Sequence, residues 1–167
     1  YLKVSGGQVT FKKYWDIPLY PREEQLDLAP AEICRQIQEL LQDAVRIRLR
    51  ADVPVGCYLS GGLDSSGITT LVVRNFNSNV RTFGIRFEQD GFDEGEHQNR
   101  MVRFLGTNHT EIQATNDKIG LTLPDCLWHC EKPLLRTAPV PLYLLSDVVH
   151  QSGFKVVLTG EGADEVF

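Results

Sequence analysis

Hydroxyl, glycine and carboxylate residues are concentrated in one short stretch of the chain, residues 60–66 (Ser-Gly-Gly-Leu-Asp-Ser-Ser). An apolar run over residues 53–59 precedes it and predicts a buried strand, and apolar residues at helical spacing follow it. A strand, a glycine-containing loop and a helix in succession place free backbone N–H groups and a helix dipole around a phosphate. The stretch therefore predicts a phosphate-binding loop.

The loop lacks the Gly-Lys-Ser/Thr ending of the common nucleoside-triphosphate loop, so no lysine would reach the terminal phosphates. Asp64 lies among the expected donors instead. Because a carboxylate beside phosphates is repulsive unless a cation lies between them, Mg²⁺ is the expected bridge. The alternative is an ordinary tight turn in which Ser65 or Ser66 caps the following helix.

A second stretch, residues 159–165 (Thr-Gly-Glu-Gly-Ala-Asp-Glu), repeats this design with more carboxylates, again after an apolar run. Its glycines permit a close approach of the backbone to a ligand. Asp164 is a candidate second Mg²⁺ ligand opposite Asp64. If a helix begins here, Glu161 shares one face of it with Asp164 or Glu165. The alternative is an acidic helix start, which the helix dipole stabilises.

Strand-like and helical patterns alternate along most of the chain. The expected strands cover 53–59, 80–87, 109–113 and 154–158, and the expected helices cover 30–50, 65–75, 94–105 (capped by Asp93), 116–131 (interrupted by Pro124) and 139–151. This alternation predicts an α/β fold with a parallel sheet covered by helices on both faces. Both candidate loops leave the carboxyl ends of strands, where ligands of open α/β sheets bind.

Composition narrows the function classes. The 167 residues carry a net charge of −5, and Arg46, Arg48 and Arg50 lie at helical spacing beside apolar residues, which indicates a solvated face. We therefore expect no nucleic-acid partner, and no apolar run is long enough for a membrane helix. Because the chain begins at Tyr1, it is expected to be a piece excised from a longer protein.

The four cysteines indicate a reducing, cytoplasmic location. Cys34 and Cys57 lie in patterns typical of packing residues. Cys126 and Cys130, with His129, lack the second pair that a zinc site requires.

Four segments carry a resemblance to a known family. Residues 60–66 resemble the pyrophosphate-binding loop of the adenylating N-type ATP pyrophosphatases, which have an adenine nucleotide alpha hydrolase-like, Rossmann-like fold. Residues 14–18 (Tyr-Trp-Asp-Ile-Pro), 50–56 (Arg-Ala-Asp-Val-Pro-Val-Gly) and 159–167 are similar to segments of the glutamine-hydrolysing asparagine synthetases. The resemblance implies that residues 1–22 are a hairpin and linker following a glutaminase domain. Residues 23–167 are then an ATP pyrophosphatase (synthetase) domain, truncated at its carboxyl end.

The resemblance implies ATP-dependent amidation of aspartate with Mg²⁺ as cofactor. The β-carboxylate of aspartate would attack the α-phosphorus of ATP, giving β-aspartyl-AMP and pyrophosphate, and ammonia from glutamine would displace AMP. A homodimer is left open. This chain lacks the glutaminase half and a later helical region that contributes a lysine, so it is expected to bind Mg-ATP weakly and to be inactive by itself.

The resemblance also implies residue roles. Pyrophosphate would be bound by Ser60, Gly61, Gly62, Ser65 and Ser66, and Mg²⁺ by Asp64 and Asp164. The adenosine moiety would contact the backbone of Leu59, Ile85 and Gly160, with Thr159 where serine is common in the family. Glu161 would act at the adenylate when ammonia attacks, and Arg136 lies in a run similar to a family stretch near the site.

Three alternatives remain open. A related synthetase would adenylate another carboxylate, as β-lactam-forming and peptide-cyclising enzymes do. A non-catalytic nucleotide-binding module is less compatible with two retained carboxylates, Asp64 and Asp164. A tRNA-thiolating enzyme is disfavoured by the acidic charge and by the absence of a Cys-x-x-Cys pair.

Overall fold

The computed structural model describes residues 1–88, 91 and 93–164. It divides the chain into two compact units, Tyr1–Gln36 and Ile37–Phe167. The helix α1 (Pro30–Arg48) contributes to both units. The domain boundary expected after residue 22 stays a prediction.

The first unit contains the expected hairpin. Strand β1 (Leu2–Ser5) pairs antiparallel with β2 (Gln8–Phe11), and Gly6 and Gly7 form the turn with φ angles of 57° and 76°. Such positive φ angles favour glycine, which explains the Gly-Gly pair in the sequence. A short 3₁₀ helix, η1 (Arg22–Glu24), follows.

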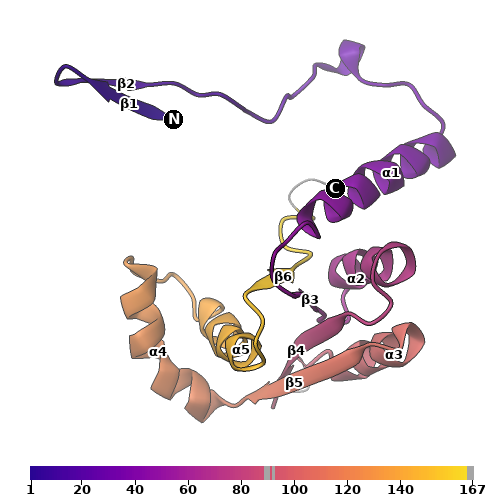
Figure 1. Ribbon diagram of the computed structural model, residues 1–167, viewed down its shortest axis with the longest axis vertical. Helices are drawn as coiled ribbons and strands as arrows, with labels where there is room; N and C mark the ends of the chain where they lie inside the picture. Colours follow the sequence, from indigo (N-terminus) through magenta and orange to yellow (C-terminus); the bar gives the residue numbers. More distant parts are fainter. Residues whose placement is uncertain (89–90, 92, 165–167) are drawn as a thin grey trace. The chain divides into compact units, whose positions relative to one another are not determined.

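The second unit is built on a four-stranded parallel sheet, which confirms the predicted fold class (Figure 1). The strand order is β5-β4-β3-β6, with bounds β3 Val55–Tyr58, β4 Arg81–Phe87, β5 Asn108–Ala114 and β6 Val156–Leu158. The connecting helices are α2 Leu63–Asn75, α3 Gly95–Leu105, α4 Asn116–Cys130 and α5 Pro139–Gln151. Three of the four strands are shorter at one end or both than the apolar runs that predicted them, and β5 is one residue longer at each end.

Helices cover both faces of the sheet, as predicted. Helix α2 packs on β3, α3 packs on β4, and the two helices contact each other. Helix α5 packs on β4 and β5 and also contacts α4. Alternating side chains supply the two cores: Cys57 and Leu158 pack with Val72 on one face, and Phe83 packs with Leu145 on the other. Burial raises the pKa of the Cys57 thiol to about 12, so this cysteine is a packing residue.

Pairing between strands ends earlier on one side of β4 than on the other. Strand β3 pairs with β4 only as far as Tyr58 opposite Phe83, and β5 continues to Ala114 opposite Phe87. The Leu59 N–H still donates to the Phe83 carbonyl (2.9 Å), and the chain then leaves the sheet. The β3-facing side of β4 therefore opens beyond Phe83.

Three local expectations are wrong. Helix α4 continues through Pro124, because proline removes one backbone hydrogen bond and bends a helix without necessarily ending it. The cap of α3 is Glu94, since the Asp93 carboxylate is bound by the Arg86 side chain. Cys34 is exposed, and the buried residue of α1 is Val45.

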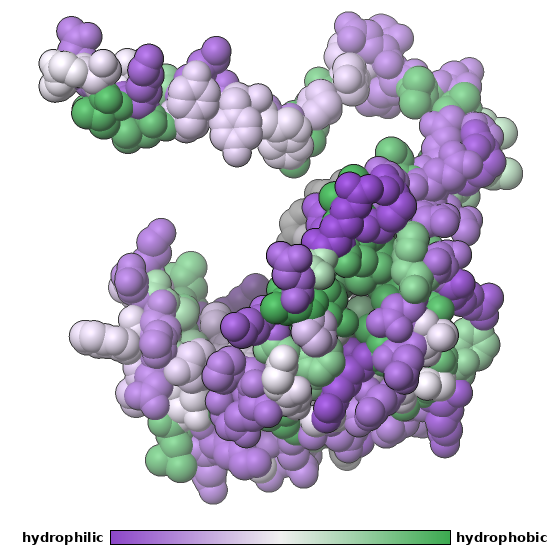
Figure 2. All heavy atoms as spheres, in the orientation of Figure 1, coloured by the Kyte–Doolittle hydropathy of each residue, from purple (hydrophilic) through white to green (hydrophobic). Residues whose placement is uncertain are grey.

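Both tryptophans are exposed, Trp15 at 69% and Trp128 at 82%. In Figure 2 apolar and aromatic residues run along the first unit, and every residue of both hairpin strands is exposed. The arginines of α1 form the expected solvated face, with Arg46 paired to Asp43. Among the described residues, no helix has the length and apolar character needed to cross a membrane.

Candidate functional site

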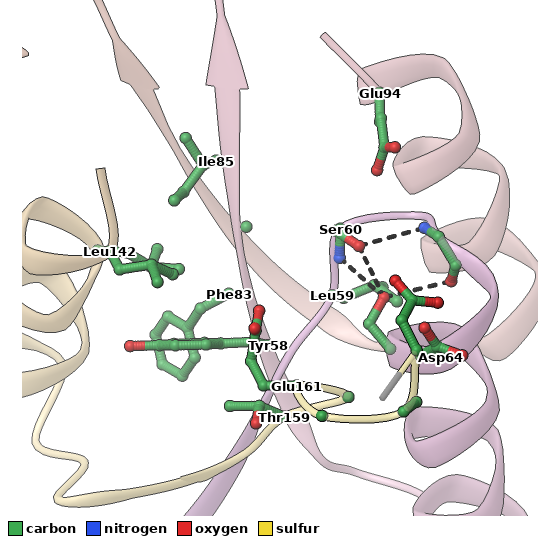
Figure 3. Close-up of a pocket in the computed structure, with 18 of the residues that line it drawn as sticks. Tyr58, Leu59, Ser60, Asp64, Phe83, Ile85, Glu94, Leu142, Thr159 and Glu161 are labelled. Atoms are coloured by element: carbon green, nitrogen blue, oxygen red, sulfur yellow. Dashed lines mark hydrogen bonds between the residues drawn. The ribbon is translucent and has the colours of Figure 1, made fainter. Parts of the chain in front are cut away.

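A cavity of about 280 Å³ opens in the second unit where β3, β4 and β6 end (Figure 3). Ten of the residues singled out from the sequence line it: Leu59, Ser60, Gly62, Asp64, Ser65, Ile85, Thr159, Gly160, Glu161 and Asp164. The two candidate loops thus converge, because each follows one of two neighbouring parallel strands.

Three residues predicted for the site lie outside this lining. Gly61 and Ser66 belong to the first loop but do not line the cavity. Arg136 is exposed and lines a neighbouring cavity of about 540 Å³. The two cavities adjoin, because their linings share Ile85, Phe87, Leu142 and Glu161.

Hydroxyl groups organise the first loop. The Ser60 and Ser65 Oγ atoms are 2.9 Å apart, the Ser60 N–H donates to Ser65 Oγ (3.2 Å), and the Gly62 N–H donates to Ser60 Oγ (3.2 Å). Ser66 Oγ is buried and has no hydrogen-bond partner in the described part of the chain. Because a buried, unpaired hydroxyl is costly, this position fits a bound water.

Helix α2 begins at Leu63 with Gly62 as its cap, and no side chain caps it. The alternative reading, in which Ser65 or Ser66 caps the helix, is therefore wrong. The first N–H groups of a helix have no partner within the helix. They remain available to an anion at the cavity, and the helix dipole favours negative charge there.

Glycine permits close contact between the two loops and their supports. A Cβ atom on Gly160 would lie 2.6 Å from the Ser65 nitrogen, so the second loop rests on the first turn of α2. Gly61 has φ +92°, and a Cβ there would lie 2.5 Å from the Gln98 nitrogen of α3. Larger residues at either position would displace the loop.

The carboxylates fit a hard cation shared with phosphates. Asp64 and Asp164 both line the cavity, and oxygen ligands suit Mg²⁺, which takes the rest of its coordination shell from phosphates and waters. Within the described ranges no three His, Cys, Asp or Glu side chains converge to hold a metal by themselves. Residues 161–164 form a turn or bend, without the helix on which a shared face depended, and Glu165 lies outside the described residues.

The cavity has an apolar side and a polar side (Figure 3). Phe83, Ile85 and Leu142 lie on one side, and Ser60, Asp64 and Glu94 lie on the other. Sequence reasoning missed Phe83, Leu142 and Glu94 as lining residues. A usable signal was Gly84, because a glycine inside a strand often marks a close approach of other groups.

An ion pair outside the lining fixes the start of α3. Arg86 donates to both Asp93 oxygens, with Nη2 to Oδ2 at 2.7 Å, and the Phe87 N–H donates to Asp93 Oδ1 (3.1 Å). The Arg86 guanidinium is the main reason why the pKa of Asp93 falls to about 2. Glu111 lies 3.7 Å from Arg86 on its other side. The pair therefore ties β4 to the segment that precedes α3.

The remaining cysteines do not form a site. Cys126 and Cys130 have Sγ atoms 4.0 Å apart on α4, and burial is the main cause that raises the pKa of Cys126. His129 instead stacks on Tyr143.

Comparison with known proteins identifies the fold and the family together. The family model described as asparagine synthase matches residues 36–167, which include the whole cavity. The chain belongs to the asparagine synthase family.

Relatives in this family cover nearly the whole chain. The chain is 34% identical over 161 residues to an asparagine synthetase (glutamine-hydrolysing) 1 of Bacillus subtilis, covering 96% of this chain and 24% of that protein. It is 35% identical over 171 aligned residues to the amidase chyE of Penicillium rubens, covering 93% and 25%. The chain thus spans about a quarter of the length of these relatives.

A solved structure supports the fold independently of close sequence similarity. The U34-tRNA thiolase NcsA of Methanococcus maripaludis aligns with a TM-score of 0.60 at 17% identity, over 83% of this chain and 48% of that chain. At this identity the likeness bears on the fold alone.

Proposed function

We propose that this chain is the nucleotide-binding part of an enzyme that amidates aspartate to asparagine at the expense of ATP. Aspartate would be activated as β-aspartyl-AMP with release of pyrophosphate, and ammonia derived from glutamine would then release AMP. The observation that carries the proposal is the convergence of two loops, rich in hydroxyl groups and carboxylates, on one half-apolar cavity in an asparagine synthase family chain.

The apolar side and the polar side of the cavity suit the two parts of ATP. A purine favours an apolar surface, and the side chains of Phe83, Ile85 and Leu142 supply one. Beyond Phe83 the β3-facing side of β4 has no paired strand, which supports a hydrogen bond between the Ile85 backbone and the base. The phosphates would then lie at residues 60–66, against hydroxyl groups and the amino end of α2.

Asp64 and Asp164 would hold Mg²⁺, which would screen the phosphate charges and favour departure of pyrophosphate. Ser60, Gly61, Gly62, Ser65 and Ser66 would bind the departing pyrophosphate, with Leu59, Thr159 and Gly160 around the nucleoside.

Glu161 is proposed to act where the carboxylate substrate meets the α-phosphate. It is exposed and lines both adjoining cavities, which supports a place between nucleotide and acid. Arg136, in the second cavity, would attract the carboxylate substrate. Both roles concern binding and orientation of groups about to react.

A related synthetase acting on another carboxylate is the second candidate. The similarity to a protein named an amidase favours it, because the nucleotide cavity would be the same and only the acid would differ. A non-catalytic nucleotide-binding module is the third candidate, and it predicts binding without turnover.

We also propose how these residues connect to the rest of the full-length protein. Residues 1–22 would connect to a glutaminase domain that supplies ammonia, and residues 23–167 would be part of the synthetase domain. The chain by itself would bind Mg-ATP weakly without forming asparagine. Four free cysteines are compatible with a reducing cytoplasm.

The test is exchange of labelled pyrophosphate into ATP, measured with the full-length natural protein that contains this chain, Mg²⁺ and a panel of carboxylic acids. Exchange that requires aspartate is expected. Exchange that requires another acid would support the second candidate, and ATP binding without exchange for any acid would contradict adenylation.

A further inference from the structure

A buried glutamine holds the last sheet residue before the loop. Gln98 of α3 is 1% exposed, and its Nε2 donates to the carbonyl oxygen of Leu59 (2.8 Å). The Leu59 N–H donates to Phe83, so both backbone polar groups of Leu59 are fixed. The next residue is Ser60, the first hydroxyl of the loop. Gln98 itself does not line the cavity.

The same glutamine continues into a chain of hydrogen bonds that ends in the α3–β5 connection. Gln98 Oε1 lies 3.2 Å from His109 Nε2, and His109 Nδ1 lies 2.9 Å from Thr82 Oγ1. Thr82 Oγ1 lies 3.0 Å from Thr107 Oγ1. Thr82 is fully buried and Thr107 nearly so, so this polar chain is largely shielded from water.

The Leu59 carbonyl determines which groups donate and which accept along this series of hydrogen bonds. A carbonyl only accepts, so the amide nitrogen of Gln98 must face it and the amide oxygen must face His109. His109 then carries its proton on Nε2, and Nδ1 accepts from Thr82. Burial lowers the pKa of His109, which favours the neutral ring. The tautomer thus follows from one acceptor at the edge of the cavity.

Two glycines make room for this glutamine. A Cβ on Gly84 would lie 2.8 Å from the Leu59 oxygen and would overlap the Gln98 amide. A Cβ on Gly61 would lie 2.5 Å from the Gln98 nitrogen. Gln98 therefore lies between β4 and the loop, in contact distance of both.

We propose that Gln98 is a positioning residue for the nucleotide loop, acting through the Leu59 carbonyl and held in orientation by His109, without contact with the nucleotide. The inference rests on the proposed function, because it takes residues 60–66 to bind ATP. The Leu59 carbonyl has a second lone pair, which stays available to the nucleoside. Loss of the amide would leave Leu59 unsatisfied and let Ser60 shift.

The first experiment compares Gln98→Met with Gln38→Met in the full-length natural protein. Methionine conserves volume but removes the amide, and Gln38 is exposed on α1. The KM for ATP, the KM for aspartate and kcat are measured by steady-state kinetics, and ATP binding by calorimetry. We expect Gln98→Met to weaken ATP binding about tenfold, with the KM for aspartate within about twofold of wild type, because a loop no longer held at Leu59 must be ordered again when ATP binds. Gln38→Met should match wild type.

The second experiment separates the hydrogen bond from packing at His109. Glutamine can place an amide donor near the position of Nε2, whereas asparagine reaches only the position of Nδ1. His109→Gln is therefore expected to retain more ATP affinity than His109→Asn, which should bind ATP severalfold more weakly. In ¹⁵N-histidine NMR spectra without nucleotide, wild-type His109 should show the Nε2–H tautomer, and Gln98→Met should lose that signature.

The outcomes distinguish the proposed function from the positioning role of Gln98. If the wild-type protein does not bind ATP, both the proposed function and this inference are overturned. If wild type binds ATP but Gln98→Met binds it equally well, or if His109→Asn matches His109→Gln, only the positioning role is overturned. An Nδ1–H tautomer in wild type would also overturn it.

Discussion

Asp64 occupies the first turn of α2, where two different physical effects favour a carboxylate. The helix dipole stabilises negative charge at this end by about 0.3–1 kcal/mol, whether or not a ligand binds. A cation bound with ATP would use the same carboxylate for chemistry. Asparagine has the shape of aspartate without its charge. Asp64→Asn would remove a small helix stabilisation in the first role and a cation ligand in the second, so this substitution distinguishes them.

Asp64→Asn is expected to lower pyrophosphate exchange by about two orders of magnitude or more, because a lost charge contact in the reacting complex costs about 3 kcal/mol or more. Its free energy of unfolding should fall by less than about 1 kcal/mol, the dipole contribution. The matched control is Asp117→Asn in the first turn of α4, which makes the same dipole change away from the cavity. Equal exchange rates in both variants would show that Asp64 serves the helix alone.

Asp93 permits a prediction of pH dependence. Its pKa falls from an ordinary value of 3.8 to about 2 in the folded chain, mainly because Arg86 binds it. The contribution of ionised Asp93 to the free energy of unfolding is therefore complete above about pH 4 and is lost as the pH falls toward 2. Asp93→Asn should lower the free energy of unfolding by about 1 kcal/mol at pH 7, since both partners are partly exposed. The difference from wild type should shrink between pH 4 and pH 2 in urea titrations.

Asp43→Asn is the control for this ion pair, because Asp43 pairs with Arg46 on the open surface of α1. We expect a change below about 0.5 kcal/mol. An Asp93→Asn deficit that persists unchanged at pH 2 would contradict the assignment of the lowered pKa to this pair.

Most lining residues of the cavity could be predicted from the sequence, because glycines, hydroxyls and carboxylates after a strand carry a local pattern. Gln98 could not, because its role depends on a carbonyl 39 positions away that packing brings within 2.8 Å. Glu94 was expected only as the first residue of a helix. Nothing local distinguishes it from other solvent-facing acids at helix starts.

At the scale of elements, the contact between the second loop and α2 makes the two halves of the cavity interdependent. The parallel sheet follows from the alternation of strand and helix patterns. This contact does not, because it depends on the strand order and register that place β6 beside β3. The continuation of α4 through Pro124 was missed for a similar reason. Proline limits a helix locally, and packing of α4 on α5 compensates.

Gly160→Ala is expected to weaken ATP binding about tenfold or more and to lower the free energy of unfolding by about 1–3 kcal/mol, because its Cβ would overlap the backbone of Ser65. Gly67→Ala in α2 is the matched control. No atom lies within 4 Å of its added Cβ, so it should stabilise the protein by about 0.5–1 kcal/mol. Calorimetric binding and urea unfolding measure both effects. A Gly160→Ala variant that binds ATP like wild type would show that the loops move independently.

At the scale of the whole molecule, the candidate site belongs entirely to the second unit. Every residue of the two hairpin strands in the first unit is exposed. We expect a chain that starts at Pro30 to bind ATP within about twofold of the complete chain, a difference below about 0.5 kcal/mol. Isothermal titration of both chains measures this. A much weaker affinity would mean that residues 1–29 support the cavity.

Trp15 and Trp128 determine what intrinsic fluorescence can measure in this chain. Because both indoles are largely exposed, their emission should already be red-shifted in the folded protein and should change little on unfolding or on filling of the cavity. Fluorescence quenching would therefore miss nucleotide binding even if it were tight. Tyr58 lines the cavity, and a tryptophan introduced there by Tyr58→Trp would give the chain an optical probe at the site itself.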